Sequence, residues 1–204
     1  MSRNLKRLID LLTAFVALIV LLPAMAGVAV AIRVTMGSPV LFRQPRAGYR
    51  GQTFTVLKFR TMREAVGPDG KVLADAERLT TVGRFLRKTS LDELPQLWNV
   101  VFGQMSLVGP RPLLVSYLPH YTEQQARRHD VLPGITGLAQ VRGRQLLVFS
   151  QRFELDVWYV DHWSLLLDLR LLLETVARIV RPRDVVLGQE VADVDDLDFS
   201  QKSS

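Results

Sequence analysis

Two adjacent carboxylates, Asp92 and Glu93, follow Ser90 at the start of a stretch with helical apolar periodicity. In the first turn of a helix, unpaired backbone N–H groups and the positive dipole end stabilise such acids, so helix stability alone can account for them. Ser90 and Glu93 also fit a capping box. Three basic residues lie just upstream of the pair: Arg84, Arg87 and Lys88. This combination of acids and cations favours a catalytic role for the two acids over a role as helix caps.

Arg111 lies between Pro110 and Pro112, shortly after the same predicted helix. The prolines fix φ on both sides of the arginine, so its planar guanidinium is presented rigidly, as bidentate phosphate binding requires. Carboxylates would repel a nucleic-acid backbone, so no nucleic acid partner is expected. The set suits phosphoryl chemistry with a divalent cation between a carboxylate and a phosphate.

The composition of the 204 residues narrows the class of protein. A net charge of +6, from 26 basic residues against 20 acids, indicates phosphate-bearing partners. The content of 48% apolar and 23% charged residues excludes a disordered or collagen-like chain. Because the chain has no cysteine, a disulfide scaffold, a thiolate metal site and a cysteine nucleophile are excluded.

An uncharged run from Leu11 to Ile32 is long enough to cross a bilayer core, which takes ~20 apolar residues. Pro23, near its middle, removes one helical hydrogen bond and predicts a bend. Basic residues flank both ends of the run, so charge does not orient a crossing. The pattern leaves open a re-entrant helix with both ends on the cytoplasmic side, an ordinary kinked span and a secretory signal peptide.

The rest of the chain predicts short elements around the acid pair. Val40–Met62 predicts a β-hairpin, in which Lys58 and Arg60 share one face of a strand. Helices are expected at four places: from Ser90 to about 102, near 122–130, before 162 and at Leu165–Val180. The last of these has an apolar face wide enough for a core or for a membrane interface.

These elements predict an α+β fold, rich in helix, with a short hairpin and interfacial amphipathic helices. The polar stretch Glu64–Thr81 contains a Gly67-Pro68-Asp69-Gly70 turn and predicts an exposed loop. We divide the chain into a membrane helix (1–36), a catalytic domain (37–188) and an acidic tail (189–204). The tail has few apolar anchors and is expected to be mobile.

Five blocks of sequence carry a resemblance that extends over nearly the whole chain. They are Lys58–Met62, Ser90–Asn99, Ser106–Pro112, Pro133–Val141 and Phe153–Val160. In these blocks and their order the chain resembles the bacterial sugar transferases of the small monotopic phosphoglycosyl transferase family. Where that family commonly has Ser-Pro at the break of its re-entrant helix, this chain has Leu22-Pro23, so the bend depends on the proline alone.

The resemblance implies an enzyme at the cytoplasmic face of the bacterial inner membrane, in contact with membrane lipid. The implied reaction moves a phosphosugar from a UDP-sugar to a polyprenyl phosphate, typically undecaprenyl phosphate, and releases UMP, with Mg2+ as cofactor. It is a first membrane step of glycoconjugate assembly, as for exopolysaccharide or O-antigen. The implied mechanism forms a covalent phosphosugar on Asp92, which also binds the metal. Glu93 supports it or acts as base for the acceptor.

A carboxylate with an ordinary pKa of ~3.9 is ionised at neutral pH and needs no activating base, which agrees with the implied role of Asp92. The resemblance also implies that Arg111 holds phosphate beside Pro112. The further candidates for binding the phosphates, nucleotide or sugar are Lys58, Arg60, Arg87, Gly134, Thr136, Gly137, Arg144 and Asp156. Any of the charged ones could instead form a structural salt bridge.

Two other functions fit the same residues. A membrane-bound phosphohydrolase would use the same aspartate, with water resolving the intermediate. A non-catalytic membrane-attached module would bind anionic lipid through its basic surface and use Asp92 and Glu93 only as helix caps. The sugar, the polyprenyl length, the pathway and the oligomeric state cannot be read from these patterns.

Overall fold

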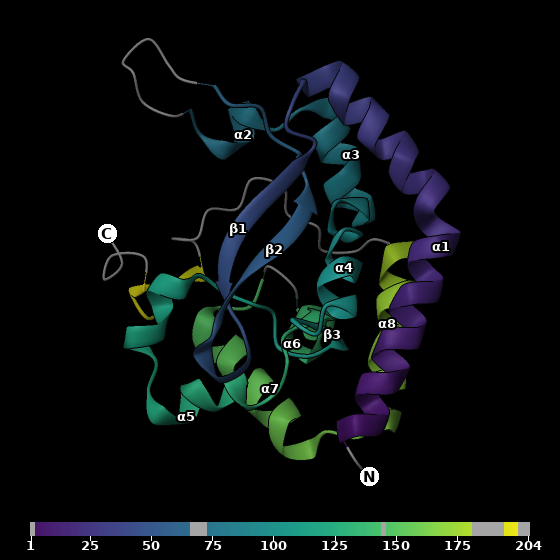
Figure 1. The fold of residues 1–204 in the computed structure, drawn as a ribbon. Helices are drawn as coiled ribbons and strands as arrows, with labels where there is room; N and C mark the ends of the chain where they lie inside the picture. Colours follow the sequence, from purple (N-terminus) through teal and green to yellow (C-terminus); the bar gives the residue numbers. More distant parts are fainter. Residues whose placement is uncertain (1–2, 66–72, 144–145, 181–193, 200–204) are drawn as a thin grey trace.

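A computed structural model describes residues 3–65, 73–143, 146–180 and 194–199. The predicted turn at Gly67–Gly70 and the candidate Arg144 lie outside these residues. The elements confirm the predicted helix-rich α+β fold (Figure 1). The main helices are α1 (Arg3–Met36), α3 (Thr81–Thr89), α4 (Gln96–Val101), α7 (Phe149–His162) and α8 (Leu165–Val180).

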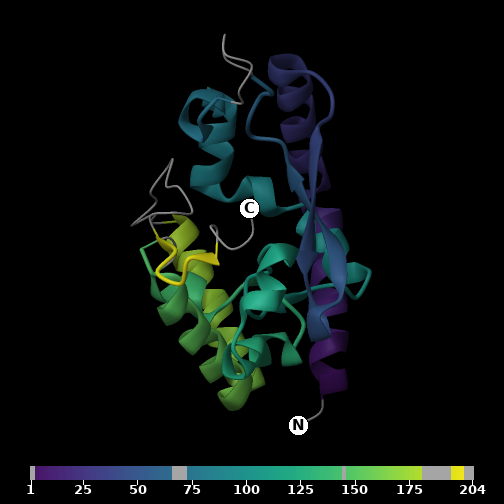
Figure 2. The same ribbon diagram turned by 90° about the vertical axis from the view of Figure 1, so that its left-hand side faces the viewer.

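Shorter elements connect these helices. The short α-helices are α2 (Asp75–Arg78), α5 (Glu123–Ala126) and α6 (Leu138–Arg142). The 3-10 turns are η1 (Tyr49–Gly51), η2 (Leu91–Glu93), η3 (Val115–His120) and η4 (Arg127–Asp130). The strands are β1 (Leu41–Ala47), β2 (Thr53–Phe59), β3 (Ser106–Val108) and β4 (Gly134–Thr136). Figure 2 shows the hairpin and α1 along one side of the molecule and α7 and α8 along the other.

The predicted hairpin is confirmed. β1 and β2 pair antiparallel from Leu41 opposite Phe59 to Ala47 opposite Thr53. A second, parallel pair joins β3 to β4, with Ser106 opposite Gly134 and Val108 opposite Thr136. The sequence predicted only a turn at β4, because three-residue strands are too short to show a period-two pattern.

Helix α1 continues through Pro23 without a break and curves around the body (Figure 1). One stripe of it is buried, formed by Asp10, Ala14, Leu18, Met25 and Ile32. The opposite side exposes large apolar side chains, including Phe15, Val20 and Leu22. By length and composition, α1 could cross or enter a membrane.

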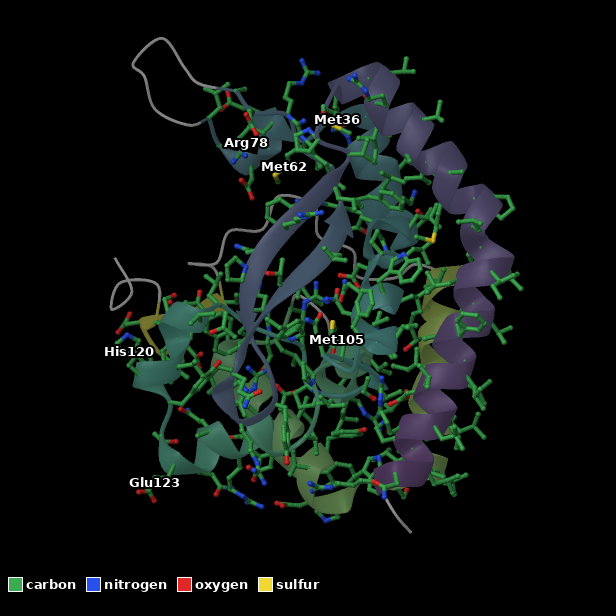
Figure 3. The ribbon with its side chains drawn as sticks, in the orientation of Figure 1. Met36, Met62, Arg78, Met105, His120 and Glu123 are labelled. Atoms are coloured by element: carbon green, nitrogen blue, oxygen red, sulfur yellow. The ribbon has the colours of Figure 1, made fainter. Side chains whose placement is uncertain are left out.

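The body holds α1 at both ends. Near its start, Arg7 donates to the carbonyl oxygens of Val100 and Val101 in α4, at 2.7 and 3.1 Å. At its end, the Thr80 hydroxyl lies 3.4 Å from the Met36 sulfur, which Figure 3 shows beside α3. The helix is therefore attached to one body at both ends.

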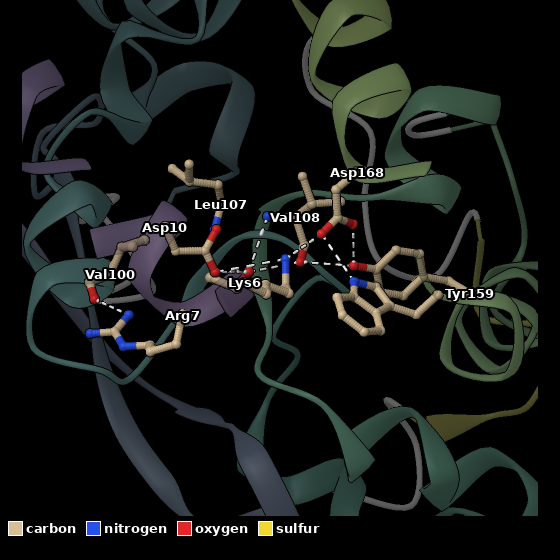
Figure 4. A network of polar contacts seen from close by, with 10 residues as sticks. Lys6, Arg7, Asp10, Val100, Leu107, Val108, Tyr159 and Asp168 are labelled. Atoms are coloured by element: carbon tan, nitrogen blue, oxygen red, sulfur yellow. Dashed lines mark hydrogen bonds and ion pairs between the residues drawn. The ribbon is translucent and has the colours of Figure 1, made fainter. Parts of the chain in front are cut away.

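A buried polar network joins α1 to β3 and to the α7–α8 junction (Figure 4). Lys6 Nζ lies 2.6 Å from Asp168 Oδ2, and the Tyr159 hydroxyl donates to Asp168 Oδ1 at 2.6 Å. Asp10 accepts from the Ser106 hydroxyl at 2.7 Å. Because these charges are paired and hydrogen-bonded, the network is compatible with the surrounding core.

The main core lies between α1, the hairpin and α8, and includes the fully buried Met105 labelled in Figure 3. A second cluster contains Tyr117, Phe149 and Phe153. Residues 194–199 of the acidic tail pack on this cluster through the buried side chains of Val194 and Phe199. This part of the tail differs from the expectation of few anchors, since Val194 and Phe199, with the partly buried Leu197, pack against aromatic side chains.

Candidate active site

The acid pair lies in η2, at the junction between α3 and α4. Ser90 has φ 58° and ψ 17°, a left-handed conformation that ends α3 and turns the chain. The predicted capping box is wrong, because the Ser90 side chain makes no capping hydrogen bond and α4 begins only at Gln96. Glu93 therefore does not reach back to the backbone and has different partners.

Those partners are two cations from distant parts of the chain. Lys58 Nζ, from β2, lies 2.7 Å from Glu93 Oε1, and Arg111 Nη2 lies 2.8 Å from the same oxygen. Burial raises the pKa of Glu93, but Arg111 and Lys58 lower it more, so the net direction is strongly downward. Glu93 is thus held ionised and ties η2 to the hairpin and to the loop after β3.

Asp92 has a different environment. It is 8% exposed, and within the described part of the chain its carboxylate makes no hydrogen bond or ion pair. Burial, then the charge of Glu93, raises the pKa of Asp92 to about 6, against the opposing effect of Lys58, Arg111 and Arg87. A carboxylate without a partner among cations is available to react with an electrophile or to bind a metal ion.

A buried ion pair between Arg128 and Asp156 holds the backbone of Arg111 in place. Arg128 donates to the Arg111 carbonyl oxygen at 2.8 Å and binds Asp156 Oδ2 through Nε and Nη2, at 3.1 and 2.6 Å. The side chains of Arg128 and Asp156 are only 2% and 3% exposed. Asp156, a candidate substrate residue, therefore acts on Arg111 through Arg128. Arg111 itself remains 43% exposed.

The candidates Gly134 and Gly137 lie where β4 packs closely against Gly109. A Cβ atom on Gly134 would come 2.1 Å from the Gly109 nitrogen, and one on Gly137 would come 2.1 Å from the Gly109 oxygen. The neighbouring Thr136 hydroxyl lies 2.7 Å from that of Thr175 in α8. These residues support the segment that leads to Arg111 and to the buried Pro112.

The remaining basic candidates divide into two groups. Arg87 Nε donates to the Thr61 hydroxyl at 3.1 Å, and its charge acts on Asp92, so it belongs to the site. Arg60 instead donates to carbonyl oxygens of Met62 and Ser38, both at 3.0 Å, and fixes the connection from α1 to the hairpin. The structure brings Lys58, Arg87 and Arg111 to the acid pair. The Arg60 guanidinium instead contacts backbone carbonyl oxygens away from the pair.

The residues present fit a magnesium ion that is shared with a substrate. In the described ranges, no three carboxylate or histidine side chains gather into a complete metal cage. Mg2+ in phosphate-processing sites is commonly held by one or two carboxylates together with substrate oxygens. The unpartnered Asp92 carboxylate could supply that contact, whereas Glu93 is engaged by two cations.

Two participants were missed by sequence reasoning. Arg128 was not singled out, although its partner Asp156 is an acid on the apolar face of an amphipathic helix, which indicates a buried cation nearby. Arg46 is one of the basic residues that follow the apolar run, and its charge alone does not distinguish it from the others. Its place on the same hairpin face as Lys58 could have been read from the alternation along the strands.

Comparisons with known proteins find a matching family model and several similar proteins. The family model described as "Bacterial sugar transferase" matches residues 1–182. The chain is 52% identical over 176 residues to an uncharacterized sugar transferase, EpsL, of Bacillus subtilis, covering 86% of this chain and 87% of that protein. It is 44% identical over 181 residues to a UDP-glucose:undecaprenyl-phosphate glucose-1-phosphate transferase of Klebsiella pneumoniae.

A third relative is an undecaprenyl-phosphate galactose phosphotransferase of Salmonella typhimurium, 39% identical over 201 residues. The matches cover 84% and 90% of this chain but only 39% of the Klebsiella protein and 42% of the Salmonella protein. The chain therefore corresponds to about two fifths of those longer relatives.

Proposed function

Because the chain belongs to the bacterial sugar transferase family, we propose that it transfers a sugar phosphate from a UDP-sugar to a polyprenyl phosphate, with release of UMP. The observation that carries this proposal is the buried Asp92 carboxylate, without a partner in the described chain and beside the Glu93–Lys58–Arg111 cluster. The printed name of the Klebsiella relative supports both the UDP-sugar donor and the undecaprenyl-phosphate acceptor, and the name of the Salmonella relative supports the acceptor.

In the proposed first step, an Asp92 oxygen attacks the β-phosphorus of the donor. The bond between that phosphorus and the bridging oxygen breaks, and its electron pair stays on the departing UMP. In the second step, an oxygen of the acceptor phosphate attacks the same phosphorus and displaces Asp92. Among the described residues, only Nη2 of Arg111 makes a side-chain hydrogen bond, which leaves its other donors to hold the phosphates during both displacements.

Glu93 is a supporting residue in this mechanism. Its pKa is lowered by Arg111 and Lys58, so it is a poor base. The acceptor phosphate, with a second pKa of ~6, is already an anion at neutral pH and needs no base. A magnesium ion held by Asp92 and donor oxygens would supply charge that offsets the repulsion between the carboxylate and the diphosphate.

The test is nucleotide release from a panel of UDP-sugars by purified protein in nanodiscs with Mg2+, with and without undecaprenyl phosphate. We expect sustained UMP formation only with the lipid and a matching sugar, and one UMP per enzyme with that sugar alone. Asp92→Asn should lower the rate by at least about 1,000-fold. The exposed acid Asp75, changed to Asn, is the matched control and should leave the rate unchanged.

The same assay separates the alternative functions. Sustained turnover without undecaprenyl phosphate would identify a phosphohydrolase. No UMP from any sugar, with Asp92→Asn changing only stability, would identify a non-catalytic module.

We also propose that α1 re-enters the cytoplasmic side of the inner membrane instead of crossing it. Both of its ends contact the same body, through Arg7 on α4 and Met36 on Thr80, so a crossing helix would draw part of that body into the ~30 Å of the bilayer core. The apolar outer side of α1 and the exposed leucines of α8, such as Leu166 and Leu173, support contact with lipid.

The absence of cysteine makes this topology easy to test. Asn4→Cys and Thr35→Cys place single thiols at exposed positions near the two ends of α1. In sealed inner-membrane vesicles, re-entry predicts that an impermeant maleimide labels both thiols from the same side. Labelling from opposite sides would show a spanning helix.

A further inference from the structure

A third arginine, Arg46, lies beside Arg111 at the end of β1. The Ala47 backbone N–H donates to the Leu113 carbonyl oxygen at 3.0 Å, which joins this end of β1 to the segment that carries Arg111. Ala47 and Arg111 also line the same small cavity. These contacts bring the end of β1 next to the Arg111 segment, and the charge of Arg111 acts on Arg46, so the two cations lie near each other.

The hairpin register places Arg46 on the face that carries Lys58. Lys58 pairs with Phe42, and side chains at 42, 44 and 46 alternate onto one face of β1. Positions 42 and 46 are four residue steps apart, or ~13 Å along an extended strand. Cations thus extend along one hairpin face, from Lys58 beside the acid pair, past Arg111, to Arg46.

Arg46 lacks the partners that satisfy the other arginines of this region. Its Nη2 donates to the neutral Gln44 side chain at 2.5 Å, and in the described ranges no carboxylate lies within ion-pair distance of it. Burial and the charge of Arg111 lower the pKa of Arg46 to about 10, so it remains protonated at neutral pH. Two partly buried like charges side by side favour a bound anion between them.

We propose that Arg46 binds the nucleotide-side phosphate of the donor, the phosphate that departs as UMP. This inference rests on the proposed function and deepens it by assigning a residue to the leaving group. The β-phosphorus must lie at Asp92, next to Lys58 and Glu93. In an in-line displacement the leaving phosphate lies on the far side of that phosphorus, which is the direction of Arg111 and Arg46.

The chemistry explains why a second arginine is useful there. As the bond from Asp92 to phosphorus forms, the bond to the bridging oxygen breaks and its electron pair moves to the nucleotide phosphate. That phosphate gains one negative charge, so a cation beside it binds more strongly in the transition state than in the ground state. Arg46 therefore assists departure without donating a proton.

The test compares Arg46→Gln, Arg46→Lys and the matched control Arg43→Gln. Arg43 is exposed on the opposite face of the same strand, so its loss removes the same charge without touching the site. We expect Arg46→Gln to lower kcat/KM for the UDP-sugar by about 10- to 100-fold and to weaken UMP binding by about 10-fold. KM for undecaprenyl phosphate and the melting temperature should stay unchanged, and Arg46→Lys should recover part of the loss.

Three results would overturn the inference. If Arg46→Gln and Arg43→Gln had the same donor kinetics and the same affinity for UMP, Arg46 would not touch the donor. The proposed function would still stand. A loss that accompanies a lowered melting temperature and is not recovered by lysine would assign Arg46 a structural role. If the unaltered protein forms no UMP, the proposed function fails first and this inference fails with it.

Discussion

At the scale of single residues, the two adjacent acids have opposite properties because they have different neighbours. Glu93 faces Lys58 and Arg111 at hydrogen-bond distance, whereas Asp92 is buried beside them without a partner of its own in the described chain. The pKa of Glu93 is therefore lowered and that of Asp92 raised to about 6. Divergent pKa values in a carboxylate pair allow one member to position the cations while the other reacts.

We expect the activity to fall in acid as Asp92 becomes protonated. A protonated carboxyl is not a nucleophile, and kcat/KM reports ionisations of the free enzyme, so kcat/KM for the UDP-sugar should have an acid limb with an apparent pKa of about 6. The measurement is initial UMP release between pH 4.5 and 8 at fixed Mg2+. A limb at the ordinary aspartate pKa of ~4 would contradict the raised value.

Neutralising each acid should change stability in opposite directions. The raised pKa of Asp92 means that its ionised form opposes folding above about pH 6, so Asp92→Asn should raise the free energy of unfolding at pH 7 by about 1–3 kcal/mol. The lowered pKa of Glu93 means that its charge supports folding, and that this support is lost as pH falls below its unfolded pKa. Glu93→Gln should therefore lower the free energy by about 1–3 kcal/mol.

Urea unfolding of the two variants at pH 7 measures this difference. Asp75→Asn, in an exposed i,i+3 pair with Arg78, is the control and should change the free energy by less than about 0.5 kcal/mol. If both variants changed the free energy of unfolding in the same direction, the two acids would not have the opposite environments described here.

At the scale of elements, the close contact of β4 with Gly109 positions Arg111. Gly134→Ala would place a Cβ atom 2.1 Å from a backbone nitrogen, so the strands must move apart. We expect a loss of about 2–3 kcal/mol in the free energy of unfolding, together with reduced activity. Gly27→Ala, in α1 with nothing within 4 Å, is the matched control and should be neutral or stabilising by up to about 1 kcal/mol. Circular dichroism melts and UMP release together check both.

Elements with a strong periodic pattern could be predicted from the sequence. The hairpin and the helix at Leu165–Val180 agree with the prediction, because alternation or a helical apolar stripe runs through each. The Ser90 turn could not be predicted, since a left-handed φ at a non-glycine residue depends on tertiary contacts.

Site residues that are close together in the sequence could be predicted, whereas contacts between residues distant in the sequence could not. Asp92 and Glu93 are adjacent, and Arg111 is marked by its two prolines, so their types and spacing indicate chemistry. The pairing of Arg128 with Asp156 joins residues 28 positions apart, and the approach of Arg46 to Arg111 joins residues from different elements. No local pattern encodes such contacts.

At the scale of the whole molecule, the Lys6–Asp168 pair joins the first turns of α1 to α8. Lys6→Met would leave Asp168 buried with the neutral donors Tyr159 and Trp163 but without a cation. We expect a loss of about 2–4 kcal/mol in the free energy of unfolding, measured by urea titration in detergent. Arg170→Met, in the exposed pair with Glu174, is the control and should stay within about 0.5 kcal/mol. Equal effects of the two changes would mean that the buried pair contributes no more than a surface one.

The attachment of α1 to the body at both ends has a mechanical consequence. A helix fixed by Arg7 at one end and by Met36 at the other cannot tilt without carrying the rest of the chain with it. If the surrounding bilayer changes the depth or tilt of α1, the body moves with the helix, and Asp92 moves with the body. The height of the carboxylate above the lipid phosphates is then set by the membrane, so turnover should depend on the acyl-chain length of the surrounding lipid as well as on the concentrations of donor and acceptor.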